Sequence, residues 1–325
     1  MTSKVSPYRG PEPARPIVDR LVEVGGGEIR AILLFGSQLV RATPSEHSAW
    51  DLVVVVDRYA PFHRALVASG HHRRPAWLLN AMARVLPPNI TAFDPGGGAP
   101  LAKCAIISAA HFARALGPRS PDHFLKGRMV QQVELLWRRE PEDEVWVEHC
   151  LGEARMNVLE WAGPFLDGPL TPASLAHGLL SVSYGGEIRP ESKGRVNDVF
   201  EAQRAFLTEA YAEVLGEAEG LGRVRTLDDG RFELVPPPGR AARRRVSLYF
   251  AVSKARATLR WFKHIVTFND WLTYIQRKVE RRTGSKIEIT PWERRLPLLL
   301  LWPKVFRVLT SRGSAPTKNL PDHER

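Results

Sequence analysis

The chain has 325 residues, of which 44% are hydrophobic and 25% are charged, values usual for a water-soluble globular protein. Its two cysteines, Cys104 and Cys150, fit neither a disulfide framework nor a zinc knuckle. The first residues are polar and rich in proline, unlike a signal peptide, and no stretch approaches the roughly 20 apolar residues that span a bilayer. We therefore expect no signal peptide, no transmembrane helix and a reducing, cytoplasmic-type compartment.

The positive charge is concentrated at one end of the chain. The net charge is +11, and residues 241–325 contain 19 Lys and Arg against 6 Asp and Glu, a local balance of +13. The preceding 240 residues contain 27 basic and 29 acidic side chains, a balance of −2. Such asymmetry indicates a polyanionic partner at that end, either nucleic acid or anionic lipid, although a basic tail without a partner is an alternative.

The first part of the chain alternates between strand and helix signals. Residues 1–16 resemble a disordered arm. Apolar runs at residues 29–35, 50–57 and 101–108 predict strands, and residues 62–68 and 75–85 predict helices. This alternation favours an α/β or α+β domain over residues 17–140.

The next hundred residues are predicted to be mainly helical. Residues 146–166 and 198–215 carry apolar side chains at helical spacing, and Thr171-Pro172 and Ser120-Pro121 each offer a helix N-cap followed by proline. Residues 222–238 predict a small hairpin or loop that ends in three prolines. We expect a second domain over residues 141–240.

Residues 241–325 are predicted to form a basic, amphipathic helical tail that associates with membranes. An apolar stripe at one-face helical spacing comprises Leu248, Val252, Ala255, Leu259, Phe262 and Val266. Four cations lie off this stripe: Lys254, Arg256, Arg260 and Lys263. A capping-box spacing at residues 290–293 predicts a second helix, which runs into an apolar segment at residues 298–306 flanked by Trp and basic residues. Either stripe packs on the protein's own core or it contacts lipid, and lipid contact is favoured for residues 298–306.

One constellation of residues could carry phosphate chemistry. A Gly36-Ser37 turn follows the first predicted strand, and Asp51 opens the second. Glycine lets backbone amides approach phosphate oxygens, and a carboxylate on the neighbouring strand can hold Mg²⁺ against a triphosphate. The pattern resembles the nucleotidyltransferase superfamily signature, but one expected acid is missing, because Ala49 and Val53 occupy the two possible positions of a second carboxylate.

The other titratable residues near these strands are interpreted as structural. Asp57 lies on the same strand as Asp51 but roughly 20 Å away, so it is expected to end the strand and not to share a metal. His63, His71 and His72 have no companion ligands at suitable spacing and are interpreted as surface or packing residues.

A wider resemblance covers residues 30–215. The segments FGSQLVRA and AWDLVVVVDRYAPFH, LAKCAIIS with Lys103, Gly127-Arg128, and SVSYGGEIRPESKGRVNDV occur in this order. Together they resemble the mitochondrial-type phosphatidate cytidylyltransferases, also called translocator assembly and maintenance proteins. Glu187 stands where that family has Asp, and Gly185 where it often has Ser. Beyond Arg240 there is no clear likeness.

This resemblance implies an α+β protein: a nucleotidyltransferase-like mixed sheet with helices, followed by a mostly helical, winged-helix-like domain. It implies that CTP and phosphatidate react, with Mg²⁺ as the cofactor, to give CDP-diacylglycerol and pyrophosphate. The roles implied for single residues are as follows: Gly36, Ser37 and Asp51 bind the nucleotide, with Asp51 as the metal ligand; Asp51, Lys103 and Lys193 are catalytic; and Ser183, Tyr184, Arg189, Lys193 and Arg195 bind substrate.

We therefore expect a peripheral enzyme at the cytoplasmic face of a membrane, held there by residues 241–325. Which residue completes the metal site stays open, with Glu46, Asp94 and Glu187 as candidates. One alternative is a nucleotidyltransferase acting on nucleic acid, protein or a small alcohol, with the tail holding nucleic acid. Nucleic acid is disfavoured because no recognition module is visible and the tail is rich in aromatic residues. Another alternative is a non-catalytic relative of the fold.

Overall fold

The computed structural model describes residues 8–40, 49–187 and 194–267. The contacts within the chain group residues 1–269 into one compact unit and residues 270–325 into a second, so all described residues belong to the first unit. The predicted boundaries at residues 140 and 240 both fall inside the first unit. The predicted helix start at residues 290–293 and the apolar segment 298–306 lie outside the described residues.

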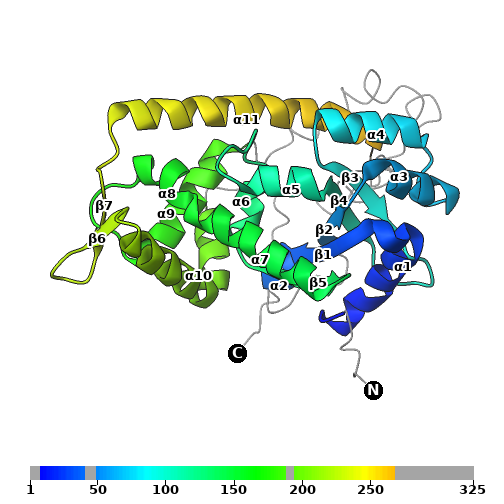
Figure 1. Ribbon diagram of the computed structural model, residues 1–325, viewed down its shortest axis with the longest axis horizontal. Helices are drawn as coiled ribbons and strands as arrows, with labels where there is room; N and C mark the ends of the chain where they lie inside the picture. Colours follow the sequence, from blue (N-terminus) through cyan, green and yellow to red (C-terminus); the bar gives the residue numbers. More distant parts are fainter. Residues whose placement is uncertain (1–7, 41–48, 188–193, 268–325) are drawn as a thin grey trace, which may run out of the picture. The chain divides into compact units, whose positions relative to one another are not determined.

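A five-stranded mixed sheet forms the centre of the first half of the chain (Figure 1). Its strands are β1 (Ile29–Phe35), β2 (Trp50–Val56), β3 (Asn89–Phe93), β4 (Ala102–Ser108) and β5 (Val133–Arg138). The order across the sheet is β3-β4-β2-β1-β5. The pair β2–β4 is parallel and the other pairs are antiparallel. The predicted strands β1, β2 and β4 are confirmed, whereas β3 and β5 were not predicted.

Helices contact both faces of this sheet, which explains why β1, β2 and β4 read as continuous apolar runs and do not alternate. On one face, side chains of β1 and β2 form a single buried cluster with residues of α1 (Arg15–Gly25) and α3 (Tyr59–Ala68), among them Ile17, Leu21 and Phe62. Helices α4 (Ala76–Val85), α5 (Ala109–Leu116) and α7 (Pro141–Met156) also contact the strands.

The second half of the chain is mainly helical, as predicted. It contains α8 (Val158–Trp161), the 3-10 turn η3 (Gly163–Phe165), α9 (Pro172–Gly186), α10 (Arg195–Gly220), and a hairpin of β6 (Val224–Thr226) and β7 (Phe232–Leu234). Thr171 caps α9, and its side chain accepts a hydrogen bond from the amide of Ser174, at 3.1 Å. The matching prediction for Ser120-Pro121 is wrong. Ser120 instead donates to the carbonyl of Asp122 at 2.7 Å in a loop, and the short α6 (Lys126–Met129) begins later.

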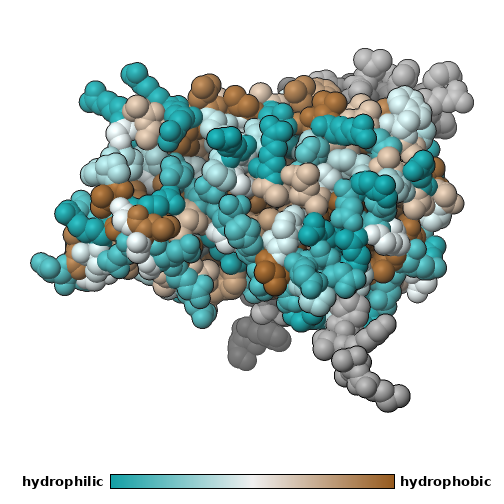
Figure 2. Space-filling model, viewed as in Figure 1, coloured by the Kyte–Doolittle hydropathy of each residue, from teal (hydrophilic) through white to brown (hydrophobic). Residues whose placement is uncertain are grey.

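The last described helix, α11 (Arg240–Thr267), contacts β3, α4, α9 and η3 and so joins the sheet to the helical part. Its orientation about its own axis separates the two alternatives left open for the apolar stripe, and it buries cations whose burial was not predicted. The predicted apolar stripe is exposed, with 66% exposure for Leu248, 60% for Leu259 and 57% for Phe262, whereas Arg260 is 1% exposed and Lys263 is 5% exposed. Figure 2 shows apolar side chains along the upper edge of the view, where α11 runs in Figure 1. Within the described residues this stripe therefore does not pack on the core.

No helix in the described part of the chain combines the length and the apolar character needed to cross a membrane.

Candidate functional site

Three adjacent strands bring the predicted nucleotide-binding residues together. Phe35, which precedes Gly36, pairs with Asp51 across β1 and β2, and Asp51 pairs with Lys103 across β2 and β4. The ammonium nitrogen of Lys103 lies 3.9 Å from the Oδ1 atom of Asp51. Both side chains lie near the first residues of their strands and are partly open to solvent, at 30% for Asp51 and 41% for Lys103, so the pair is accessible to a ligand.

Gly36 is required by the geometry beside this pair. Its φ angle is +85°, which is unfavourable for residues with a side chain, and a Cβ atom at this position would lie 3.0 Å from the Oδ2 atom of Asp51. Ser37 begins the four-residue helix α2 (Ser37–Val40) directly after this turn. The turn therefore allows the backbone to pass close beside the carboxylate of Asp51.

The predicted substrate-binding residues of α9 have a different environment. Ser183 is fully buried, and its hydroxyl hydrogen-bonds the Nε2 atom of His123 at 3.0 Å. A Cβ atom on Gly127 would lie 2.7 Å from this hydroxyl, so α6 and α9 touch closely at this glycine. Ser183 thus holds α9 against the segment around His123, whereas Tyr184 is half-buried on the same helix.

Glu187 follows α9 and pairs with Arg128 of α6, with 3.2 Å between the Oε2 and Nη1 atoms. Its side chain is 7% exposed. Asp94, the second metal-site candidate, accepts a hydrogen bond from the amide of Gly96 at 2.9 Å in the glycine-rich loop. Among the described residues no group of three His, Cys, Asp or Glu side chains could hold a metal ion.

Two predicted residues, Arg189 and Lys193, lie outside the described residues, as does Glu46. Arg195 is half-buried at the first position of α10. Two turns further along, buried Gln203 accepts a hydrogen bond from the amide of Gln132 at 2.9 Å, which ties α10 to the chain just before β5. Helix α10 also contacts α2, so it approaches the Gly36-Ser37 turn.

The remaining predicted structural residues have the contacts that were expected of them. Asp57 lies at the far end of β2 and pairs with Arg139 at 2.6 Å. His63 is buried and bonds Asn80 at 2.7 Å, and burial lowers its pKa to about 4. His72 hydrogen-bonds the carbonyl of Thr267 at 2.8 Å, and burial lowers its pKa too.

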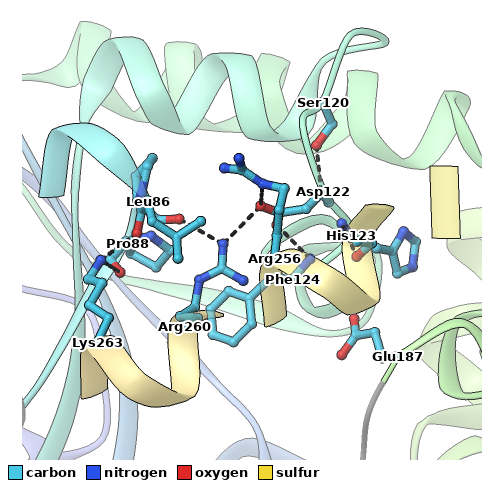
Figure 3. Close-up of polar contacts among 12 residues, drawn as sticks. Leu86, Pro88, Ser120, Asp122, His123, Phe124, Glu187, Arg256, Arg260 and Lys263 are labelled. Atoms are coloured by element: carbon cyan, nitrogen blue, oxygen red, sulfur yellow. Dashed lines mark hydrogen bonds and ion pairs between the residues drawn. The ribbon is translucent and has the colours of Figure 1, made fainter. Parts of the chain in front are cut away.

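The charged side of α11 forms a buried ion cluster with Asp122, shown in Figure 3. The Oδ2 atom of Asp122 accepts a hydrogen bond from Arg256 and another from Arg260, both at 2.8 Å. Burial alone would raise the pKa of Asp122, but these two guanidinium groups lower it below its usual range. The loop containing Ser120 is thereby fastened to the last described helix.

Three successive carbonyl groups complete this cluster. Arg260 donates to the carbonyl of Pro87 at 3.0 Å, and Lys263 donates to the carbonyls of Leu86 and Pro88 (Figure 3). Burial, followed by the charge of Arg260, lowers the pKa of Lys263 to about 6. Sequence reasoning missed this side of the helix because it considered only the apolar stripe as the face that makes contacts, and placed the basic residues off that stripe. The signal was present, since Arg256, Arg260, Lys263 and His264 repeat at helical spacing.

The cluster lies near the predicted nucleotide site. The charge of Lys103 acts on His264 of α11, whose pKa burial lowers to about 3. Two guanidinium carbons lie near the aromatic ring of Phe124, that of Arg128 at 4.1 Å and that of Arg260 at 4.4 Å from its centre. Lys103 of β4 pairs with Asp51, and the charges of Lys103, Arg260 and Arg128 all act on His264, so residues of β4, α6 and α11 lie within electrostatic range of one another.

Comparison with known proteins adds no assignment, because no protein-family model matches the chain and no curated protein matches it significantly.

Proposed function

We propose that this protein is a Mg²⁺-dependent nucleotidyltransferase that joins CTP to phosphatidate, giving CDP-diacylglycerol and pyrophosphate at a membrane surface. The observation that carries the proposal is the placement of Gly36, Asp51 and Lys103 at three adjacent strands: Gly36 directly follows β1, Asp51 lies on β2 and Lys103 lies on β4. The mixed sheet is compatible with a nucleotidyltransferase-like domain, and the helices followed by the β6–β7 hairpin are compatible with a winged-helix-like part.

The chemistry needs little more than alignment and charge neutralisation. A phosphate oxygen of phosphatidate attacks the α-phosphorus of CTP, and the bond from that phosphorus to the bridging oxygen of the β-phosphate breaks, releasing pyrophosphate. Because the attacking oxygen is already ionised, no strong general base is required. Asp51 would hold Mg²⁺, which neutralises phosphate charge when bound, and Lys103 would lie against the same phosphates.

The glycine turn supplies room for this arrangement. With no Cβ atom at Gly36, the backbone passes beside the carboxylate of Asp51 and leaves its exposed side to the ligand. The resemblance places Lys193 and Arg195 near phosphate groups and Arg189 at the cleft between domains, and Arg195 begins α10.

The membrane part of the proposal is supported by the exposed stripe of α11. Leu248, Leu259, Trp261 and Phe262 are each more than half exposed. Arg244, Arg245 and Lys254 are exposed on the same helix and suit an anionic surface. Three other basic residues of α11, Arg256, Arg260 and Lys263, are engaged in buried contacts with Asp122 and with backbone carbonyls. The charge that the described part of the tail offers to lipid is therefore smaller than its sequence suggests.

The decisive experiment supplies the full chain with Mg²⁺, phosphatidate in detergent and either CTP or ATP, and measures CDP-diacylglycerol. We expect product with CTP and little with ATP, and a loss of about 100-fold or more in Asp51→Asn, because Asp51 would hold and align the metal and the triphosphate. Asp57→Asn is the matched control, since Asp57 lies at the other end of the same strand and pairs with Arg139. Equal activity in Asp51→Asn and wild type would refute the site.

Binding measurements separate the two alternatives. Salt-sensitive binding of nucleic acid without recruitment to phosphatidate vesicles would favour a nucleotidyltransferase acting on nucleic acid. Failure to bind CTP in the presence of Mg²⁺ would favour a non-catalytic relative. Recruitment to anionic but not neutral vesicles, reduced in Leu259→Ser, would support the lipid substrate.

A further inference from the structure

Two consecutive turns of α11 carry buried nitrogen atoms that lack a hydrogen-bond partner. Arg260 is 1% exposed, yet only its Nη2 atom is bonded, to Asp122 and to the carbonyl of Pro87. Within the part of the chain that the structure describes, its Nε and Nη1 atoms and the Nε2 atom of His264 are buried without a partner. Because an unmade hydrogen bond to a buried group is costly, such groups usually mark a bound ion, water or ligand.

The charges around these atoms are mainly positive. Burial lowers the pKa of His264 most, and the charges of Lys103, Lys263, Arg260 and Arg128 lower it further. Four cations face three carboxylates here, because Asp122 pairs with both Arg256 and Arg260, Glu187 pairs with Arg128, and Asp51 pairs with Lys103. The missing partner is therefore expected to be an anion.

The geometry favours a phosphate in particular. The guanidinium groups of Arg128 and Arg260 lie against the Phe124 ring, at 4.1 and 4.4 Å from its centre, which restrains both. Two N–H groups of one guanidinium match the spacing of two phosphate oxygens. His264 lies four residues after Arg260, hence on the same side of the helix, and a protonated Nε2 atom would donate to a third oxygen.

We infer that Arg260 and His264 of α11, with Arg128 of α6 and Lys103 of β4, bind a phosphate group beside Asp51. The inference rests on the proposed function, in which this phosphate belongs either to the CTP triphosphate or to phosphatidate. Both sources present the same chemistry to the site. Helix α11 then contributes directly to substrate binding, although the likeness to known cytidylyltransferases does not extend to it.

The test measures binding to the full chain by isothermal titration calorimetry, with pyrophosphate, CTP and dihexanoyl phosphatidate as separate probes, each with Mg²⁺. Arg260→Met removes the charged donors and should weaken binding by about 30-fold, and His264→Leu should weaken it by about fivefold. Arg256→Met is the matched control, because Arg256 bonds the same carboxylate as Arg260 but none of its atoms belongs to the unpartnered set. It should leave affinity unchanged.

The pattern of weakening identifies the source of the phosphate. A loss confined to pyrophosphate and CTP assigns the site to the nucleotide, and a loss confined to dihexanoyl phosphatidate assigns it to the lipid. Unchanged affinity for all three probes in His264→Leu and in folded Arg260→Met would overturn the inference. Equal weakening in Arg256→Met would also overturn it, since the effect would then come from the ion cluster alone. If Arg260→Met does not fold, His264→Leu decides.

The same variants separate this inference from the proposed function. Suppose that pyrophosphate binding depends on Arg260 and His264 but no CDP-diacylglycerol forms. This result would support the phosphate site and refute the cytidylyltransferase proposal. Formation of CDP-diacylglycerol with wild-type kcat and KM in both variants would leave the function standing and overturn the phosphate site.

Discussion

The carboxylate of Asp122 neutralises two guanidinium groups of α11, and its removal should destabilise the protein strongly. In Asp122→Asn both cations lose their negative partner. The Arg256 side chain is 26% exposed and can turn toward water, but the Arg260 side chain is 2% exposed and cannot. Removing one partner of a buried ion pair costs about 3–5 kcal/mol. Since a single guanidinium is left uncompensated, we expect a loss near the lower limit, about 3 kcal/mol of unfolding free energy.

Urea unfolding of the full chain, followed by tryptophan fluorescence and far-UV circular dichroism, measures this loss. Asp229→Asn is the control, because Asp229 pairs with Arg231 at 2.5 Å with both side chains about half exposed, and it should barely change the midpoint. The double variant Asp122→Leu with Arg260→Met should recover part of the loss, because no buried guanidinium then lacks a partner. An Asp122→Asn protein with the wild-type midpoint would refute the assignment of Asp122 as the anchor of α11.

Two further predictions follow from single contacts. Gly36→Ala combines a φ angle of +85° with a Cβ atom 3.0 Å from the Oδ2 atom of Asp51; backbone strain should cost about 1–2 kcal/mol in urea unfolding. Displacement of the carboxylate should lower CDP-diacylglycerol formation about 100-fold, and wild-type turnover would contradict this reasoning. Lys263 has a pKa of about 6 in the folded protein, below its ordinary value of 10.5. Between these two pH values the unfolded chain binds one proton more than the folded protein, so the free energy of unfolding should rise with pH. Lys263→Met should flatten the rise measured between pH 6.5 and 8.5, and an unchanged slope would show that Lys263 is not its source.

The three strands next to the site could be predicted because strands that are buried on both faces have continuous apolar sequences. Residues 29–35, 50–57 and 101–108 are apolar runs of strand length, and all three form central strands. Strands β3 and β5 lie at the two edges of the sheet. Residues 89–93 form a run too short to stand out, and β5 is mostly half-buried, with Glu134 among its apolar residues. Edge strands carry mixed patterns, so periodicity alone did not reveal them.

The helix α11 was predictable in extent but not in orientation. Its apolar residues Leu248, Val252, Leu259 and Phe262 repeat at helical spacing, and so do the residues of its buried side. A hydrophobic pattern normally marks the buried face, because buried cations are costly unless paired. Here the pairing comes from Asp122, which is 138 residues away from Arg260 in the sequence. A contact over such a separation is invisible to local periodicity.

Within the site, too, residues in local motifs could be predicted, whereas contacts between distant segments could not. Gly36, Asp51 and Lys103 could be predicted because they belong to local motifs on neighbouring strands. Ser183 was assigned to substrate binding by position, whereas its hydrogen bond to His123 depends on the packing of α6 against α9. The unpartnered nitrogen atoms of Arg260 and His264 could be found only after the three-dimensional contacts were known.

The inverted orientation of α11 limits how the protein can approach a bilayer. A helix that left the body in order to insert would withdraw Arg260 and Lys263 from Asp122 and from the carbonyls of Leu86, Pro87 and Pro88. Contact through Leu259 and Phe262 instead needs no such opening, because these side chains already face outward. An α-helix is about 10–12 Å across. A lipid surface touching the outer stripe would therefore lie about one helix diameter from Arg260 on the inner side. In the proposed function, α11 would then keep a constant distance between the bilayer and the nucleotide site.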